Sequence, residues 1–437
     1  MSGSRYNSEL NEMPVQNFVT YNHMQQVPIL YRLTRCRRSS VLVTANAYHL
    51  SPRCSTNPGA EAWPLTLVND KLHVSSTGVE TTLRILPTPR AMTTTSSSPI
   101  PVITLADTPE CAASLLEAAR TLGFVHIKSA DVPKASIDSI FAIVSPRKPW
   151  YPTTQFVWMH FDSVSKAKQF FSLPSAAKDP FRITASNHGY SALHSEYLDP
   201  TTQARGDFKQ AFNIAEPALT KNTPLPPLLA VHDTELLAFR AQCHALCQRI
   251  LALFALAFEL DDTYFQNAHD SPAQGNSGSI LRMLYYPPTG DGFGEQKGDI
   301  RAGAHSDYGS VTLLFQELSD DSGSLELLMP KGGGWRKVPV IEDAICMNIG
   351  DLMSFWTGGV LKSTVHRVVG NKERWSVAYF CHPVDETLLE GIPSHVVKKY
   401  GRETVERRVM TAREHLEGRL RATYGWGKND EEKTVRE

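Results

Sequence analysis

The sequence predicts a mainly β protein with flanking α-helices, in which a helical N-terminal region precedes a jelly-roll core. Two observations predict this fold class. Apolar residues recur at helical spacing between residues 232 and 260, whereas after Gly278 the chain becomes a series of short strand-like runs separated by turn residues. Many short strands with regular turns are typical of a sandwich or barrel, and the double-sheet jelly roll is one common form.

Composition is that of a globular protein with a substantial core. The 437 residues are 41% hydrophobic and 20% charged, and the formal net charge is −1. The chain has no bulk attraction to nucleic acid, no basic patch with interleaved aromatic residues in its core, and no apolar run long enough to span a membrane. Seven scattered cysteines do not resemble a disulfide framework. We therefore expect a cytoplasmic monomer that binds a small molecule, and neither nucleic acid nor membrane.

The first 97 residues differ from the rest in composition and sequence pattern. They include the Arg- and Ser-rich stretch RLTRCRRSS (32–40), and TTTSSSP (93–99) follows at their end. We expect residues 1–97 to be a poorly ordered extension, or an upstream segment wrongly joined to the reading frame. Mitochondrial targeting is a minor alternative, because the Arg-rich part resembles a transit peptide but Glu9 and Glu12 count against one.

Ordered structure is expected from residue 98, with a helical region over 98–270. A strand is predicted at IPVITLAD (100–107), a helix from about Ala112 to Gly123, and a second strand at FVHIKS (124–129). Further helices are predicted from Ser136 and at SKAKQFFSLP (165–174). Between them, three prolines break both periods, so residues 144–160 are interpreted as an inserted loop.

The longest helix signal runs from about His232 to Leu260. Its apolar stripe includes Cys243 and Cys247. We interpret this pair as core packing rather than as a metal or redox site.

The predicted β-core covers residues 278–393. Its runs are SILRMLYY, VTLLF, SLELL, WRKVPV, AICMNI, LMSFW, TVHRVV and WSVAYF. A helical pattern returns near Ser394, and the chain ends in the charged sequence KNDEEKTVRE, so residues 394–437 are expected to form a C-terminal helix and a solvated tail. We expect one composite domain, helices first and then the β-core.

Three residues in this core have the types and spacing of a metal site. His305 and Asp307 are two apart in AHSDYGSVTLLFQ, so they project to the same face of a strand, and His366 lies in another short β-run. Two imidazoles and one carboxylate on one face of an ion leave three positions open, as in non-haem Fe(II) oxygenases. A structural zinc site would need four closed ligands, typically with cysteines, and none lies near these histidines in sequence.

A second pair suits a carboxylate ligand. Arg374 and Ser376 are two apart on the next predicted strand. A guanidinium beside a hydroxyl can hold a carboxylate by a bidentate ion pair and one further hydrogen bond. Next to a metal triad, this pair is a candidate cosubstrate clamp.

Several ordered motifs together resemble one known family. AHSDYGSVTLLFQ, NIGDLMSFWTGGVLKSTVHRVV and RWSVAYF are similar to the iron- and 2-oxoglutarate-dependent dioxygenases of the isopenicillin N synthase-like family. IPVITLAD, FFSLPSAAKDPFRI, HGYSAL, GDFKQAFNIAEP and LRMLYYPP resemble other parts of that family. The resemblance covers residues 100–425, about three-quarters of the chain, and implies a double-stranded β-helix core with helices packed around it.

The resemblance also implies roles for individual residues. His305, Asp307 and His366 match the iron ligands, and Arg374 and Ser376 match the residues that grip the distal carboxylate of 2-oxoglutarate. Tyr286 matches the tyrosine that helps to hold the cosubstrate, although Leu284 stands where many plant relatives have asparagine. The implied cofactors are Fe(II), 2-oxoglutarate and O2, with ascorbate as an optional stimulant.

The implied reaction is oxidation of a small molecule, by hydroxylation or desaturation, with release of succinate and CO2. The sequence pattern resembles that of fungal members of the family. This suggests a role in secondary metabolism, with natural-product intermediates, nucleobases or carboxylic acids as substrates. Relatives run almost directly from the helix before the inserted loop into the helix after it, so a retained intron explains the loop as well as a real insertion does. Candidate substrate contacts are His188, Tyr190, Phe212, Asn213, Phe380 and His382.

Two other functions remain compatible with these residues. An Fe(II)-dependent oxidase of the same fold would use no 2-oxoglutarate, and its Arg-x-Ser pair would grip the substrate instead. A non-catalytic binding protein on this fold would not bind Fe(II). Stoichiometric succinate release separates the first from a dioxygenase, and Fe(II) binding separates the second.

Overall fold

The computed structural model describes residues 100–145, 165–203, 205–215, 224–270, 276–290, 300–317, 324–401 and 409–424, together with six strands nearer the N-terminus. It divides into two compact units, Met1–Thr94 and Thr95–Glu437. The predicted domain boundaries at residues 98, 270, 278 and 394 stay predictions.

The first unit contains two three-stranded antiparallel sheets. The sequence carries no clear signal for these strands, and the rest of residues 1–97 lies outside the described residues. The expectation of a poorly ordered or wrongly joined extension therefore stays a prediction. The strands are β1 (Asn17–Tyr21), β2 (Pro28–Arg35) and β3 (Val41–Asn46) in one sheet, and β4 (Leu65–Val68), β5 (Lys71–Ser76) and β6 (Val79–Arg84) in the other.

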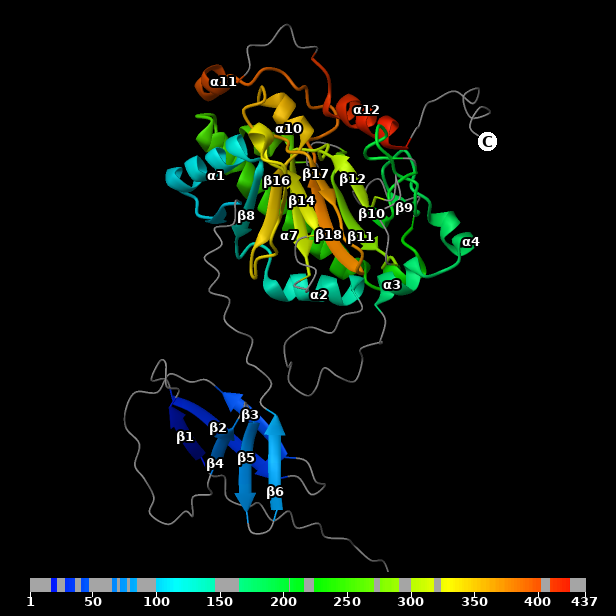
Figure 1. Cartoon of the computed structure of the whole chain (residues 1–437). Coiled ribbons are helices and arrows are strands. Elements are labelled where there is room, and N and C mark those ends of the chain that lie inside the picture. Colours follow the sequence, from blue (N-terminus) through cyan, green and yellow to red (C-terminus); the bar gives the residue numbers. More distant parts are fainter. Residues whose placement is uncertain are drawn as a thin grey trace, which may run out of the picture. The chain divides into compact units, whose positions relative to one another are not determined.

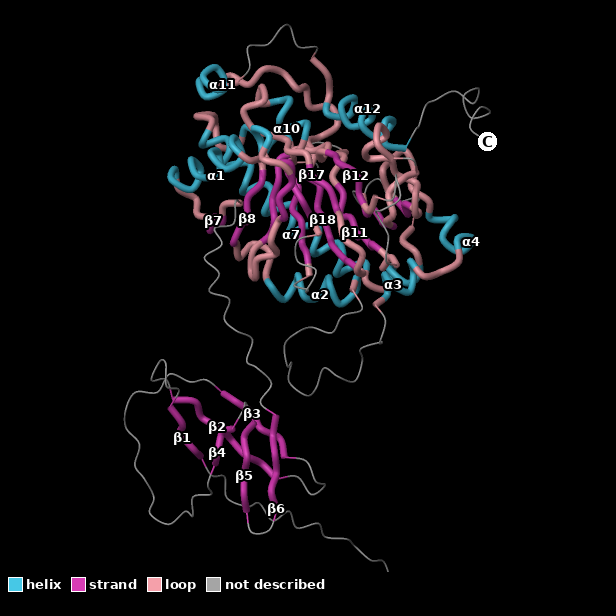
Figure 2. The backbone as a smooth tube through the Cα atoms, in the orientation of Figure 1, coloured by secondary structure: helices cyan, strands magenta, loops and turns pink. Residues whose placement is uncertain are grey.

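The second unit is built on two sheets (Figures 1 and 2). All strand pairs are antiparallel except β7 with β8. The eight-stranded sheet has the order β7 (Val102–Thr104), β8 (Phe124–Lys128), β16 (Ile345–Ile349), β13 (Val311–Gln316), β18 (Arg374–Cys381), β11 (Ile280–Tyr286), β10 (Gln210–Ile214), β9 (Gly189–Ser191). The four-stranded sheet has the order β12 (Ala302–His305), β17 (His366–Val368), β14 (Leu325–Leu328), β15 (Trp335–Lys337).

Side chains of the large sheet alternate between two cores. Along β18, Trp375, Val377 and Tyr379 are buried in the core shared with the helices. Ala378 is buried in a second cluster that also contains residues of β12, β14 and β17, so the two sheets pack face to face. Because alternate residues share a face, Ser376 also projects between the sheets. This inner face carries the functional site described below.

Helices cover the outer face of the large sheet and the ends of the sheets. The predicted helix at 232–260 is confirmed as α7, which packs against α1, α2, α8 and β18. Cys243 and Cys247 are free and fully buried on it, as core packing requires. The helices are α1 (Pro109–Thr121), α2 (Lys134–Val144), α3 (Lys166–Phe171), α4 (Ser175–Lys178), α6 (Pro227–Ala230), α7 (Asp233–Ala257), α8 (Tyr264–Ala268), α10 (Asp351–Trp356), α11 (His395–Tyr400) and α12 (Ala412–Tyr424), with 3-10 turns η2 (Asp179–Phe181) and η3 (Pro330–Gly332).

The predicted inserted loop falls mostly outside the described residues, which stop at 145 and resume at 165. Its two ends lie together, because Ser165 Oγ donates a hydrogen bond to the carbonyl oxygen of Val144 at 2.9 Å. The described residues on either side of this gap are therefore neighbours at the end of α2 and the start of α3.

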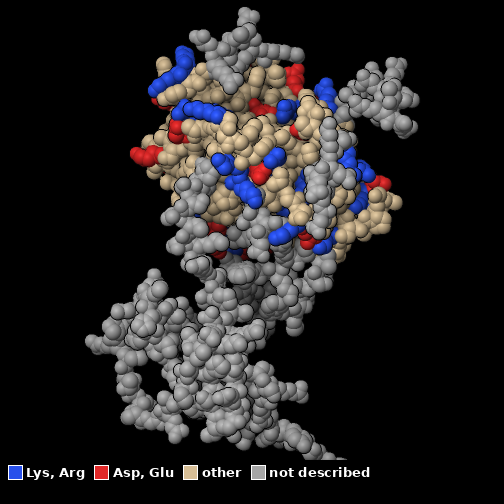
Figure 3. All heavy atoms as spheres, viewed as in Figure 1, with Lys and Arg blue, Asp and Glu red and all other residues tan. Residues whose placement is uncertain are grey.

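The helices and the surface charges of the described residues bear on the expectations about membranes and net charge. None of their helices is long and apolar enough to cross a membrane. On the face of the second unit seen in Figure 3, Lys and Arg side chains are interspersed with Asp and Glu side chains. This mixed surface is in keeping with the formal net charge of −1.

Candidate metal centre and adjoining pocket

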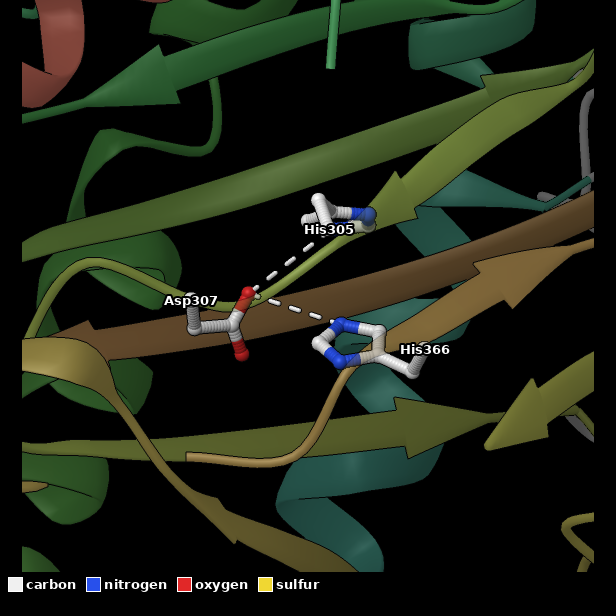
Figure 4. Close-up of side chains that lie close together, drawn as sticks. All are labelled: His305, Asp307 and His366. Carbon is white, nitrogen blue, oxygen red and sulfur yellow. Dashed lines mark ion pairs between the residues drawn. The ribbon is translucent and has the colours of Figure 1, made fainter. Parts of the chain in front are cut away.

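Three predicted ligands meet between the two sheets. His305 ends β12, His366 begins β17, and these two residues are direct partners in the antiparallel pairing. In Figure 4 their side chains and that of Asp307 point toward one another. Asp307 Oδ1 lies 3.9 Å from His305 Nε2 and 3.6 Å from His366 Nε2. The three donor atoms lie within 4.8 Å of one another, a spacing that one metal ion can bridge.

Hydrogen bonds orient each of the three donors. His305 Nδ1 lies 2.7 Å from the carbonyl oxygen of Gly303, and His366 Nδ1 lies 3.0 Å from that of Thr364. We assign the proton of each ring to Nδ1, because a carbonyl can only accept. Each Nε2 is then left with a free lone pair toward the centre, as metal-binding histidines require.

The carboxylate of Asp307 is fixed in the same way. Its Oδ2 accepts hydrogen bonds from Thr312 Oγ1 at 2.7 Å and from Asn348 Nδ2 at 2.6 Å. This leaves Oδ1 directed toward the histidines. The turn after Asp307 is tight: a Cβ on Gly350 would lie 2.2 Å from the carbonyl oxygen of Gly309, so the packing of this turn against the start of α10 requires glycine.

The protonation states of Asp307 and His305 suit a metal site. Burial opposes charge on His366, but Asp307 outweighs it and raises the pKa of His366, so a bound metal would displace a proton from this ring. Burial favours the neutral form of Asp307, but the neighbouring His366 and His305 and the bond from Asn348 outweigh it and hold its pKa below the usual range. Burial and repulsion from His366 lower the pKa of His305 to about 3. An anionic carboxylate and a neutral imidazole are the forms that bind metal.

A cavity adjoins this triad on the inner face of the large sheet. His305, Asp307 and Tyr286 line one part of it, and α12 (red in Figure 1) supplies Leu416, Leu420, Thr423 and Tyr424. Most of the remaining wall is apolar. The apolar residues of the wall are Leu198, Ile280, Leu284, Ala302, Phe380, Leu416 and Leu420.

Three charged side chains also line the cavity, namely Glu196, Lys209 and Arg282. Lys209 Nζ lies 2.9 Å from Glu196 Oε2 and also contacts Asp207, and Arg282 Nη2 contacts Glu196 Oε1. Tyr424 donates to Glu196 Oε1 at 2.7 Å. Burial opposes charge on Glu196, but Arg282 and Lys209 hold its pKa well below its usual range. Burial likewise opposes charge on Lys209, but Asp207 and Glu196 raise its pKa above its usual range.

The residues of the predicted cosubstrate clamp also lie together on the inner face, next to Tyr286 of the cavity wall. Arg374 Nη1 donates to Ser376 Oγ at 2.9 Å, and Arg374 Nη2 donates to Gln316 Oε1 at 2.8 Å. The guanidinium carbon of Arg374 lies 5.0 Å from the centre of the Tyr286 ring. Tyr286 is the direct strand partner of Arg374, so the register of β11 and β18 brings these two residues together.

The candidate substrate contacts separate into two groups. Phe380 and His382 line the cavity, and burial together with His415 and His269 lowers the pKa of His382 to about 3. Tyr190 and Phe212 instead lie in the core shared with the helices. His188 packs edge-on against Phe212, and Asn213 Nδ2 donates to Asn187 Oδ1 at 2.9 Å. The last four are not among the residues that line the cavity.

Sequence reasoning missed the charged wall of the cavity. One part of it had a signal: Arg282 and Tyr286 are four apart on one strand, so an inward Tyr286 implies an inward Arg282. Leu416 and Leu420 likewise share one face of the C-terminal helix. Glu196 lies in a loop and had no comparable signal.

Comparison with known proteins identifies the family. Residues 277–383 match the profile of the 2OG-Fe(II) oxygenase superfamily. Over 337 residues the chain is 34% identical to UPF0676 protein C1494.01 of Schizosaccharomyces pombe, an alignment that covers 75% of this chain and 93% of that protein. The chain belongs to the 2OG-Fe(II) oxygenase superfamily.

Two other members illustrate this oxygenase family. A full-length Neurospora crassa protein, crystallised in complex with alpha-KG and thymine, has 28% sequence identity and a TM-score of 0.59, with 74% of this chain and 96% of that chain covered. Homoarginine-6-hydroxylase 2-ODD-C23 of Glycine max is 26% identical, over 75% of this chain and 98% of that protein.

The chain is therefore a non-haem oxygenase that uses Fe(II), 2-oxoglutarate and O2 to oxidise a small molecule, with release of succinate and CO2. The predicted jelly-roll fold, enzyme class and cofactors are confirmed. An oxidase without 2-oxoglutarate and a non-catalytic binding protein both lose support, because hydroxylases and 2-oxoglutarate-dependent enzymes are among the relatives of this oxygenase.

Proposed function

We propose that His305, Asp307 and His366 bind the catalytic Fe(II) of this oxygenase. The convergence of two imidazole nitrogens and one carboxylate oxygen within 4.8 Å of one another is the observation that carries this proposal. The donor set fits Fe(II), because three ligands on one face leave positions for a cosubstrate and O2. When bound, the iron with 2-oxoglutarate and O2 supplies the oxidant that breaks a substrate C–H bond.

We propose that Arg374, Ser376 and Tyr286 bind 2-oxoglutarate. The guanidinium neutralises the distal carboxylate, and the hydroxyl groups of Ser376 and Tyr286 donate to it. The contacts of Arg374 with Ser376 and Gln316 support this role, since they fix the guanidinium before the cosubstrate arrives. Leu284 occupies the position of the asparagine found in many plant relatives, so this chain relies on the clamp without that amide.

The substrate enters the cavity between the large sheet and α12. Phe380 and His382, the two predicted contacts that line this cavity, would touch it. The other predicted contacts, including Tyr190 and Phe212, are not carried into this proposal, because packing explains their burial.

We also propose a monomeric, cytoplasmic enzyme that binds neither nucleic acid nor membrane. Free, buried cysteines among the described residues support a reducing compartment. The near-zero formal net charge supports the absence of nucleic acid from its partners.

The test is an anaerobic titration of the Fe(II)-loaded protein with 2-oxoglutarate. Chelation of the iron by the keto and carboxylate oxygens should produce a weak visible charge-transfer band that saturates. Iron binding without this band would favour the oxidase that uses no 2-oxoglutarate, and failure to bind iron would refute the proposed triad.

A further inference from the structure

The charged side chains in the wall of the substrate cavity belong to a buried network without net charge. Two cations of the wall, Lys209 and Arg282, pair with two carboxylates: Glu196, which also lines the cavity, and Asp207, which contacts Lys209 but does not line the cavity. Each carboxylate has further partners: Tyr424 donates to Glu196, and the backbone nitrogen of Gly303 donates to Asp207 Oδ1 at 3.0 Å. The formal charges of these four groups sum to zero.

These groups also leave no easy place for an ionic ligand. The side chains of Glu196, Lys209 and Asp207 are 3%, 4% and 0% exposed, so their charges are held by one another rather than by solvent. A ligand carboxylate near Arg282 would compete with Glu196, and a ligand cation near Glu196 would compete with Lys209. Either charge would lose its hydration and would have to compete with an ion pair that is already formed, which is costly.

The iron side of the cavity is balanced too if the proposed function is correct. Fe(II), the carboxylate of Asp307, the 2-oxoglutarate dianion and the guanidinium of Arg374 carry formal charges that also sum to zero. The buried charges around the cavity, Asp207 included, and those of the iron site then carry no net charge.

Two polar atoms of the wall lack a hydrogen-bond partner among the described residues, His382 Nδ1 and Arg282 Nε. The Nε of Arg282 is buried and has no hydrogen-bond partner among the described residues. It is a donor, so it calls for an acceptor atom on the ligand. Seven aliphatic or aromatic side chains elsewhere in the wall offer only apolar contact.

We infer that the substrate is an uncharged small molecule with an apolar body and a hydrogen-bond acceptor, such as an amide or ring carbonyl, which Arg282 receives. This inference rests on the proposed function of the site. It names the class of molecule and the residue that selects it.

A matched ligand series tests the charge preference directly. Benzamide, benzoate and benzamidine have the same ring and similar size, but they are neutral, anionic and cationic at neutral pH. Thymine and 5-carboxyuracil form a second pair, neutral and anionic. Each is titrated by calorimetry into the protein loaded with Fe(II) and 2-oxoglutarate without O2, so that binding is measured and turnover is absent.

For the wild type we expect at least one neutral probe to bind, and each neutral probe that binds to do so about tenfold more tightly than its charged analogues. Tighter binding of benzoate, benzamidine or 5-carboxyuracil than of the neutral analogue would overturn the inference. So would the absence of binding by both benzamide and thymine at several millimolar.

Two variants extend the test by unbalancing the wall in opposite directions. Glu196→Gln leaves an excess positive charge and should shift the preference toward benzoate, whereas Arg282→Gln leaves an excess negative charge and should shift it toward benzamidine. The exposed His395→Gln is the matched control and should change neither preference. Unchanged ligand preferences in both folded variants would refute the role given to the charged wall.

The proposed function is tested separately in the same samples. The charge-transfer band with 2-oxoglutarate reports on the iron and the clamp, whose residues neither variant replaces. If the wild type lacks this band, the proposed function fails; if the band is normal and charged probes bind best, the inference about the substrate alone fails. Circular dichroism and the band together identify any variant that has not folded.

Discussion

Replacing His126 with leucine should make the oxygenase less sensitive to acid. His126 lies on β8 with 1% of its surface exposed, and neither ring nitrogen has a hydrogen-bond partner among the described residues. Burial lowers its pKa from 6.5 to about 4. The folded protein therefore keeps this imidazole neutral at a pH where the unfolded chain protonates it.

The direction and size of the change in stability with pH follow from the difference between the folded and unfolded pKa values of His126. A histidine with a depressed pKa does not destabilise the folded state above the unfolded pKa of 6.5. As the pH falls from 6.5 toward the folded pKa of about 4, the unfolded state binds the proton first, and the folded state loses stability. Linkage between those two pKa values gives a loss of about 2 kcal/mol between pH 7.5 and pH 5. His126→Leu cannot take up the proton, so this part of the acid sensitivity should disappear.

Urea unfolding at both pH values measures the effect, with chelator present so that both proteins are metal-free. Other buried histidines contribute to acid sensitivity in both proteins, and the difference between wild type and variant removes them. His395→Gln, at an exposed position, controls for loss of a histidine. If His126→Leu and wild type lose the same free energy of unfolding between these two pH values, the assignment of a neutral buried His126 is wrong.

Three further predictions concern the iron and its cosubstrate. His366→Ala should abolish iron binding and turnover, because two protein ligands remain; iron retained after desalting measures this, and a full equivalent would contradict it. Arg374→Ala should weaken 2-oxoglutarate binding by about 1.5–3 kcal/mol, the contribution of a charged hydrogen bond. An unchanged affinity in the anaerobic titration would exclude that role. Gln316→Leu removes the acceptor 2.8 Å from Arg374 Nη2 and should weaken 2-oxoglutarate binding by about 1 kcal/mol without changing iron affinity. Equal weakening of iron binding would show a general disturbance instead.

The parts of the site that share one strand could be predicted from the sequence. The two-residue spacing of Arg374 and Ser376 places this pair on one face of β18 whatever the rest of the fold does. The same spacing predicted a shared strand face for His305 and Asp307, but β12 ends at His305, and Asp307 reaches the centre from the segment that follows the strand. Pairing of β12 with β17 then brings His366 opposite His305. The long apolar stripe of α7 was equally informative, because burial of one helix face dictates its spacing.

Residues whose role depends on contacts between distant segments could not be predicted in this way. Glu196 and Lys209 precede β10, Arg282 lies in β11, and Tyr424 ends the C-terminal helix, yet they form one ion network. Nothing in the local pattern at Glu196 predicts that its carboxylate is buried. The same holds for His126. Alternation in FVHIKS predicts that it lies on the same face as Phe124, but does not predict that its ring lacks a hydrogen-bond partner among the described residues.

Stability alone does not explain the buried charges near the cavity, because apolar residues of similar volume often stabilise a protein core at least as well as ion pairs. The contacts of Asp207 supply a further explanation for these charges. Its Oδ2 contacts Lys209, while its Oδ1 accepts from the backbone nitrogen of Gly303. The carbonyl oxygen of the same Gly303 accepts from Nδ1 of His305, and so fixes the orientation of that imidazole. An apolar residue at position 207 could pack in this space but could not hold Gly303, so one side of the charged wall also positions a metal ligand. The cavity proposed to receive the substrate and the strand that presents His305 are therefore connected through two hydrogen bonds.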